Sequence, residues 1–203
     1  GRALSAALAD FVGALLLADV AAAPEGPWCA LDVDGVLETG VVAGSTAPGL
    51  AGGLALRALV AHGHRVLLAT GRGTDEVAVR RAAWGLPGAV AEYGASLVLG
   101  DGTVVDQRSP DDVAGIDAAR GWLSGRDGVV VDPGHRFAIR AWRTGPDGEG
   151  RGPLSPDDLR GAVAAGGGEL VAVPGDDQTD LVPAGVSKHQ GVRALVERVD
   201  PGR

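Results

Sequence analysis

Apolar residues along the chain follow two spacings, which predict where helices and strands lie. Leucines and Phe11 recur at helical intervals over residues 2–20, before Pro24 and Pro27 interrupt the pattern. Short apolar runs predict buried strands at 28–33, 65–69 and 89–92, and the segments between them predict helices at 50–62 and 74–84. Strands that alternate with helices in this way favour an α/β fold with a parallel sheet covered on both faces.

The rhythm changes after Gly94, where the sequence predicts an inserted module. Strands at 96–99 and 103–105 flank Gly100-Asp101-Gly102, which is typical of a hairpin turn. Further helices are expected at 111–123, at 155–165 with Ser155 as its cap, and at 188–198. Further strands are expected at 129–131, 136–142 and 170–173. We therefore expect an N-terminal helix within 1–25, a core formed by 26–99 and 180–203, and an α+β insert at 100–179.

Charge and cysteine content exclude several classes of function. The net charge is −8 and the basic residues are scattered, so the chain lacks the positive patch with which proteins bind nucleic-acid phosphates. Cys29 is the only cysteine, which excludes an intrachain disulfide framework and a cysteine-rich zinc site. The apolar stretch 8–23 contains Asp10 and Asp19 and has no basic leader, so we expect neither a signal peptide nor a membrane span. We expect an acidic cytoplasmic protein that handles a metal ion or a small ligand.

Two carboxylates follow the first predicted strand. Asp32 and Asp34 lie two positions apart, and Gly35 follows where the chain must turn. Ligands bind outside the carboxyl ends of strands in an open parallel sheet, so both carboxylates should stand at the mouth of that crevice. Side chains two positions apart on a strand share a face, and a divalent cation would compensate the two like charges. Oxygen ligands favour Mg²⁺, whereas an Asp-Gly pair alone would indicate only a turn.

A hydroxyl and a single ammonium group mark two further segments. Thr70, Gly71 and Arg72 follow the predicted strand 65–69, where the threonine hydroxyl and the N–H groups of the next turn can bind phosphoryl oxygens. The glycine spacing does not match a dinucleotide-binding loop. Lys188 is the one lysine among 18 basic residues and begins the final predicted helix. A single lysine among arginines indicates a site that requires a compact positive charge. The alternative is that one of the basic residues happens to be lysine.

The three motifs, in this order, resemble those of the haloacid dehalogenase (HAD) superfamily of phosphohydrolases. More narrowly, residues 28–203 are similar to members that carry a large cap between the second and third motifs, as in Cof-like and sugar-phosphate phosphatases. The resemblance implies a Rossmann-like parallel-sheet core with an inserted α+β cap. It also implies Mg²⁺-dependent hydrolysis of a small phosphomonoester, with a phosphorylated metabolite as the partner molecule; the oligomeric state stays open.

The resemblance implies a role for each motif residue. Asp32 would be the nucleophile that attacks phosphorus and forms an aspartyl-phosphate. Asp34 would be the general acid and base, and its backbone carbonyl would bind Mg²⁺ together with the carboxylate of Asp32. The phosphoryl oxygens would be held by Thr70, Gly71, Arg72 and Lys188.

The sequence departs from the family pattern at two places. Tyr93 stands where capped members usually have Asn in Glu-Asn-Gly-Ala. An acidic Gly-Asp-x-x-x-Asp motif, which should follow Lys188 and supply further Mg²⁺ ligands, is missing. The stretch from Asp176 to Asp180 resembles it but precedes the lysine, and we expect it to be a turn between two strands. Because the chain contains no methionine, we expect a piece of a longer protein, truncated before that motif.

The insert and the incomplete motif set leave alternatives open. Arg136, Arg140 and Trp142 share one face of the predicted strand 136–142 and suit a phosphorylated or sugar-like ligand, although a solvated face explains them equally well. A phosphomutase of the same superfamily is the second enzymatic reading. A catalytically incomplete binding or interaction domain is the alternative from a different class.

Overall fold

The computed structural model describes residues 2–18, 25–42, 45–47, 49–145 and 147–202. The chain forms two compact units. The first, here the core unit, contains Gly1–Val105 and Lys188–Arg203, and the second, here the inserted unit, contains Asp106–Ser187. The α/β class with an inserted α+β module is therefore confirmed. None of the helices in these described ranges is long and apolar enough to cross a membrane.

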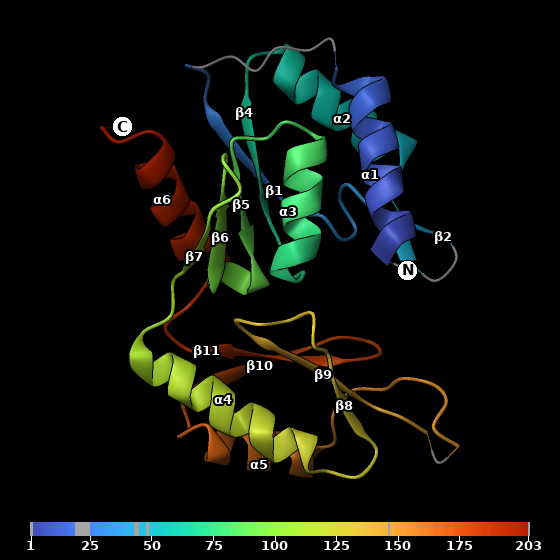
Figure 1. Cartoon of the computed structure of the whole chain (residues 1–203), viewed down its shortest axis with the longest axis vertical. Coiled ribbons are helices and arrows are strands. Elements are labelled where there is room, and N and C mark those ends of the chain that lie inside the picture. The colour runs from blue at the N-terminus through green and yellow to red at the C-terminus, as the bar shows by residue number, and fades with distance from the viewer. Residues whose placement is uncertain (1, 19–24, 43–44, 48, 146, 203) are drawn as a thin grey trace. The chain divides into compact units, whose positions relative to one another are not determined.

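A five-stranded sheet organises the core unit (Figure 1), with strand order β1-β4-β5-β6-β7. Strands β1 (Trp28–Leu31), β4 (Arg65–Ala69) and β5 (Gly88–Ala91) are parallel, and β6 (Ser96–Leu99) pairs antiparallel to β5. Strand β7 (Val104–Asp106) lies at the edge, joined to β6 by the predicted hairpin. The expected strand 65–69 is confirmed residue for residue. The expected strands 28–33 and 89–92 are confirmed with shifted ends.

Helices cover both faces of this sheet, which explains why its strands are continuously apolar. Val66 and Leu68 of β4 pack in the cluster that includes α2 (Leu50–Ala61) and α3 (Thr74–Ala83). Leu67 and Ala69, which alternate with them, pack on the opposite face against Leu195 of α6 (Lys188–Val199). Helix α1 (Arg2–Leu16) lies against α3 and confirms most of the predicted helix 2–20; residues 17–18 form a turn, and 19–20 lie outside the described residues.

A small two-stranded sheet, β2 (Gly40–Val42) with β3 (Ser45–Ala47), follows the first motif and was not predicted. It interrupts a segment whose composition indicated only turns. Because β3 lies close to α1, this hairpin belongs to the same side of the core unit as that helix.

The inserted unit is a four-stranded antiparallel sheet with two helices on one face (Figure 1). Its strands are β8 (Val129–Val131), β9 (Ile139–Arg143), β10 (Leu170–Pro174) and β11 (Thr179–Pro183), in the order β10-β11-β9-β8. Its helices are α4 (Pro110–Ser124) and α5 (Pro156–Ala165). Ser109 and Ser155 cap them, each in a reciprocal capping box, so the predicted Ser155 cap is confirmed.

The expected boundaries of the insert, 100 and 179, differ from those of the structure. The hairpin after Gly100 extends the core sheet, so the inserted unit begins at Asp106. At the other end, β11 pairs with β10 on one side and with β9 on the other, so the chain returns to the core only at Lys188. The acidic stretch between β10 and β11 is a turn, as expected, closed by a hydrogen bond from Gly175 N–H to the Gln178 carbonyl.

Candidate functional site

Asp32 and Lys188 meet at the carboxyl end of β1 although 156 positions separate them in the sequence. Lys188 Nζ lies 2.5 Å from Asp32 Oδ2, and the other carboxylate oxygen accepts a hydrogen bond from Val33 N–H at 2.7 Å. The side chains are 34% and 38% exposed, so this ion pair remains open to solvent and to a ligand. A carboxylate oxygen and a cation therefore stand side by side where the strands end.

The position of Lys188 depends on how closely α6 approaches the end of β5. Gly191 faces Val90 and the short helix η1 (Glu92–Gly94), and a Cβ on it would lie 2.6 Å from Val90 Cγ1 and 3.0 Å from Gly94 Cα. No side chain can occupy that space without moving backbone atoms. The glycine three positions after Lys188 is thus required by packing, and it brings the first turn of α6 to the site.

Thr70 and Gly71 continue β4 into the same edge of the sheet. Thr70 is fully buried, and its hydroxyl accepts a hydrogen bond from Arg72 N–H at 3.3 Å. Gly71 packs against the ring of Tyr93, to which a Cβ at this position would come within 2.4 Å. The end of β4 is therefore held in a fixed conformation by its own turn and by the segment after β5.

Asp34 is bound by Arg72. The guanidinium donates to both carboxylate oxygens, from Nε at 3.0 and 3.2 Å and from Nη2 at 2.6 Å. Burial alone would lower the pKa of Arg72, but the hydrogen bonds and charge of Asp34, together with Glu38 and Glu76, outweigh it and raise that pKa above its ordinary value. Arg72 is therefore a permanent cation. Its side chain binds carboxylates, whereas the sequence analysis expected it to bind phosphoryl oxygens.

The ionic contacts continue inward through two residues that the sequence did not single out. Arg72 Nη2 lies 2.9 Å from Glu38 Oε2. Arg80 of α3 donates hydrogen bonds to the same carboxylate, from Nε at 2.7 Å and from Nη2 at 3.0 Å. The Glu38 and Arg80 side chains are almost completely buried. No local pattern could reveal this pair, because 42 positions separate its members.

The segment after β5 carries an unusual backbone. Glu92 and Tyr93 have φ of 47° and 62°, in the left-handed region that a bulky residue rarely adopts. The buried Glu92 carboxylate accepts hydrogen bonds from Thr74 N–H at 3.1 Å and from its hydroxyl at 2.7 Å, which ties the segment to the start of α3. The Tyr93 ring lies 5.9 Å from Lys188 Nζ, so the aromatic replacement for Asn is beside the candidate site.

The oxygen donors present are those that a hard cation takes. Among the described residues, no three His, Cys, Asp or Glu side chains are grouped to hold a metal. The Asp34 carboxylate is engaged by Arg72, which leaves the carboxylate of Asp32 and the carbonyl of Asp34 as the candidate ligands. Mg²⁺ usually keeps several waters and binds through one or two carboxylates and substrate phosphate, so this donor set fits it.

In the inserted unit, the two predicted substrate arginines have different settings. Arg140 forms a bidentate ion pair with Asp180 of β11, at 2.8 Å for both contacts. Its charge is therefore compensated within the sheet. Arg136 precedes β9, which begins only at Ile139, and its guanidinium lies 5.5 Å from the Phe137 ring. The expected common face of Arg136, Arg140 and Trp142 is thus limited to the last two.

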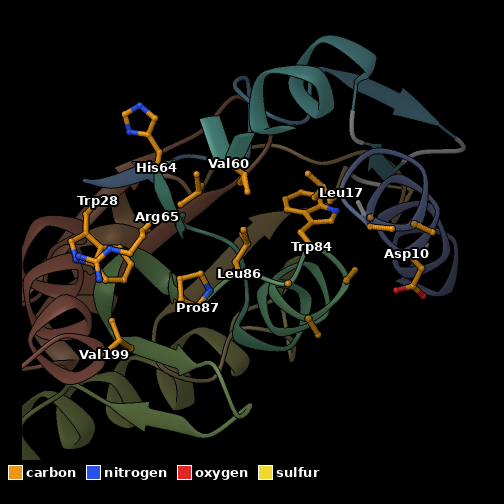
Figure 2. Close-up of a pocket in the computed structure, with 17 residues that line it drawn as sticks. Asp10, Leu17, Trp28, Val60, His64, Arg65, Trp84, Leu86, Pro87 and Val199 are labelled. Atoms are coloured by element: carbon orange, nitrogen blue, oxygen red, sulfur yellow. The ribbon is translucent and has the colours of Figure 1, made fainter. Parts of the chain in front are cut away.

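A cavity of about 720 Å³ lies elsewhere in the core unit (Figure 2). It is lined by Trp28 and Arg65, the first residues of β1 and β4, and by Trp84 and Leu86. These residues mark the amino ends of the strands, opposite the end at which Asp32 and Lys188 meet. None of the predicted catalytic residues lines it, so the cavity and the candidate site are separate features.

Comparisons with known proteins connect this geometry to a fold. No protein-family model matches the chain, and no curated protein matches it significantly. A protein of Thermoplasma acidophilum has a TM-score of 0.63 at 18% identity, covering 85% of this chain and 71% of that one. The C-terminal domain of C. albicans trehalose-6-phosphate phosphatase has a TM-score of 0.58 at 14% identity, covering 97% and 66%. A sugar phosphatase of HAD subclass IIB has a TM-score of 0.57 at 13% identity, covering 85% and 75%. The chain thus has a fold similar to that of these phosphatases.

Proposed function

We propose that the protein is a phosphoric monoester hydrolase that cleaves a small sugar phosphate through an aspartyl-phosphate on Asp32. The observation that carries this proposal is the 2.5 Å contact between Lys188 and Asp32 at the end of the sheet where Thr70 also lies. An open carboxylate beside a cation and a hydroxyl is the arrangement that positions a phosphoryl group for attack. Structurally similar proteins named as sugar-phosphate phosphatases support the substrate class.

In the first step, a carboxylate oxygen of Asp32 forms a bond to phosphorus. The bond between phosphorus and the ester oxygen breaks, its electron pair goes to the ester oxygen, and the Asp34 carboxyl supplies the proton that completes the alcohol. Lys188 and Thr70 hold the other phosphoryl oxygens and stabilise the charge that they carry in the transition state. Lys188 also holds the Asp32 side chain in place while the substrate is absent.

In the second step, water attacks the phosphorus of the aspartyl-phosphate. Asp34, now a carboxylate, accepts a proton from the water, and the Asp32 carboxylate is released together with inorganic phosphate. The sum is one phosphomonoester and one water converted to one alcohol and one phosphate. Mg²⁺, held by the Asp32 carboxylate and the Asp34 carbonyl, would reduce the repulsion between the nucleophile and the substrate dianion.

The proposal is tested on the purified protein with trehalose 6-phosphate, glucose 6-phosphate and p-nitrophenyl phosphate. We expect release of inorganic phosphate with at least one ester, loss of activity with EDTA, and recovery on adding Mg²⁺. Phosphate released from a single substrate also separates a hydrolase from a phosphomutase, which would return the phosphoryl group to a sugar. Absence of phosphate release from all three esters with Mg²⁺ present contradicts the proposal.

A further inference from the structure

Four side chains of alternating charge run from the candidate site into the interior of the core unit. They are Asp34, Arg72, Glu38 and Arg80, in that order of contact. The Asp34 side chain is 53% exposed, whereas the Arg72, Glu38 and Arg80 side chains are 7%, 0% and 2% exposed. Two negative and two positive charges balance within the row, and only its outer end is open to a ligand.

The outer contact raises a problem for the proposed chemistry. To give a proton to the ester oxygen of a substrate, Asp34 must turn away from Arg72, to which it is joined by short hydrogen bonds. Turning away would leave a buried guanidinium without its partner, which is among the most costly events in a protein interior. A second carboxylate that stays with Arg72 removes most of that cost.

Glu38 is placed to be that second carboxylate. Its Oε2 lies 2.9 Å from Nη2 of Arg72, the same nitrogen that donates to Asp34 Oδ1 at 2.6 Å. Glu38 cannot follow Asp34 outward, because Arg80 binds both of its oxygens. Glu76 lies 3.8 Å from Nη1 of Arg72, beyond hydrogen-bonding distance, and does not substitute for Glu38.

We propose that Glu38, fixed by Arg80, is a positioning residue that keeps Arg72 paired whenever Asp34 turns toward the substrate. The proposal rests on the proposed phosphatase function. Without Glu38, the nearest carboxylate that competes with Asp34 for Nη2 of Arg72 would be lost, and Asp34 would be held more firmly in the resting contact. Protonation of the departing ester oxygen by Asp34 is then slowed, whereas attack of Asp32 on phosphorus is not.

Two aryl phosphates of nearly equal shape separate these effects. Phenyl phosphate has a poor leaving group, so its P–O bond breaks efficiently only when the departing oxygen receives a proton. The leaving group of p-nitrophenyl phosphate is the stable p-nitrophenolate, which departs with little protonation. For Glu38→Gln we expect kcat/KM, which reports the first step alone, to fall about tenfold more with phenyl phosphate than with p-nitrophenyl phosphate, a fraction of the usual contribution of general acid catalysis.

The control removes an ion pair from the same unit at the other end of the sheet. Asp200 pairs with Arg65, the first residue of β4, at 2.7 Å. We expect Asp200→Asn to change kcat/KM for phenyl phosphate and for p-nitrophenyl phosphate by the same factor. Should Glu38→Gln fail to fold, the double variant Glu38→Gln with Arg80→Met removes both buried charges and leaves neither uncompensated. It should show the same selective loss.

Selective loss with phenyl phosphate supports the inference. An equal loss with both esters, or no loss, overturns it and leaves the proposed phosphatase function intact, because both esters are still hydrolysed by the wild-type protein. Failure of the wild-type protein to hydrolyse either ester counts against the proposed function itself, and the inference falls with it.

Discussion

Two ion pairs of the core unit lie at the carboxyl end of its sheet, whereas two of the inserted unit join one strand to another strand and to a helix terminus. Lys188–Asp32 and Arg72–Asp34 each include a side chain that is one-third to one-half exposed. Arg140–Asp180 and Arg143–Asp158 each include a carboxylate that is almost completely buried. Open carboxylates can meet a ligand, and buried ones hold the fold.

The comparison teaches how to interpret arginines in a sequence. Arg72 and Arg140 both suggested substrate contacts, yet each is bound by a carboxylate about forty positions distant, Asp34 in one case and Asp180 in the other. Lys188 differs from these arginines, because its ion pair with Asp32 is the least buried one at the candidate site. The predictions that follow test whether the two sets of ion pairs really do different work.

The largest effect is expected from Asp32→Asn. An amide is not a nucleophile toward phosphorus, so kcat should fall by about a thousandfold or more, the scale of nucleophile removal in other enzymes. Thermal unfolding should change little, because Asp32 is partly exposed. Steady-state kinetics and calorimetry measure both. Activity within tenfold of wild type would contradict the assignment of the nucleophile.

Lys188→Met should come next. Removing the cation that we propose holds the phosphoryl oxygens is expected to lower kcat/KM about a hundredfold, the loss typical of one preorganised electrostatic contact. The matched control is Arg193→Met on the same helix, where the pair with Glu197 is exposed and should contribute little. If both variants lose activity to the same extent, Lys188 has no special role.

In the inserted unit, Asp158→Asn should affect stability and not chemistry. Asp158 accepts hydrogen bonds from Arg143 at 2.6 Å and from the Ser155 hydroxyl at 2.6 Å. Losing these charged hydrogen bonds should lower the free energy of unfolding by about 2 kcal/mol. Asp157→Asn, one position earlier and exposed, is the control. A Mg²⁺-saturated kcat that falls while unfolding is unchanged would contradict this division of roles.

A smaller effect is expected in the pH dependence of unfolding. Hydrogen bonds from Arg143, followed by those from Ser155, hold the pKa of Asp158 well below its usual range despite burial. A carboxyl with a depressed pKa in the folded state contributes stability above its unfolded pKa of about 4, and the contribution is lost as the pH falls from there toward the folded pKa. Chemical denaturation from pH 6 to pH 3 should therefore show a steeper loss for wild type than for Asp158→Asn. Parallel curves would disprove the role of this carboxyl.

The sequence predicts best what local pattern determines. Strand β4 was located correctly because the four consecutive apolar positions 66–69 indicate a short buried element, and the Ser155 cap because its partner lies three positions away. The place of Asp32 at the end of β1 followed from a general property of parallel sheets, whose ligands bind outside the carboxyl ends of the strands, whereas the proximity of Lys188 was implied by the resemblance to the HAD superfamily.

What could not be predicted depends on partners distant in the chain. The pair of Glu38 with Arg80 has no local signature, and Arg80 by itself looks like a surface residue of a helix. The end of the insert was misplaced because a strand such as β11 shows its neighbours only when the sheet is assembled. Long-range pairing, and not element formation, therefore limits the prediction of the site.

Direct detection of the covalent intermediate tests the central claim most sharply. In Asp34→Ala, attack by Asp32 on p-nitrophenyl phosphate remains possible, while the water that should cleave the aspartyl-phosphate lacks its base. We expect a burst of p-nitrophenol equal to the enzyme present and, after acid quenching and peptide mass spectrometry, a phosphoryl group on the peptide that contains Asp32. Release of p-nitrophenol with no phosphoryl group on Asp32 would contradict the account.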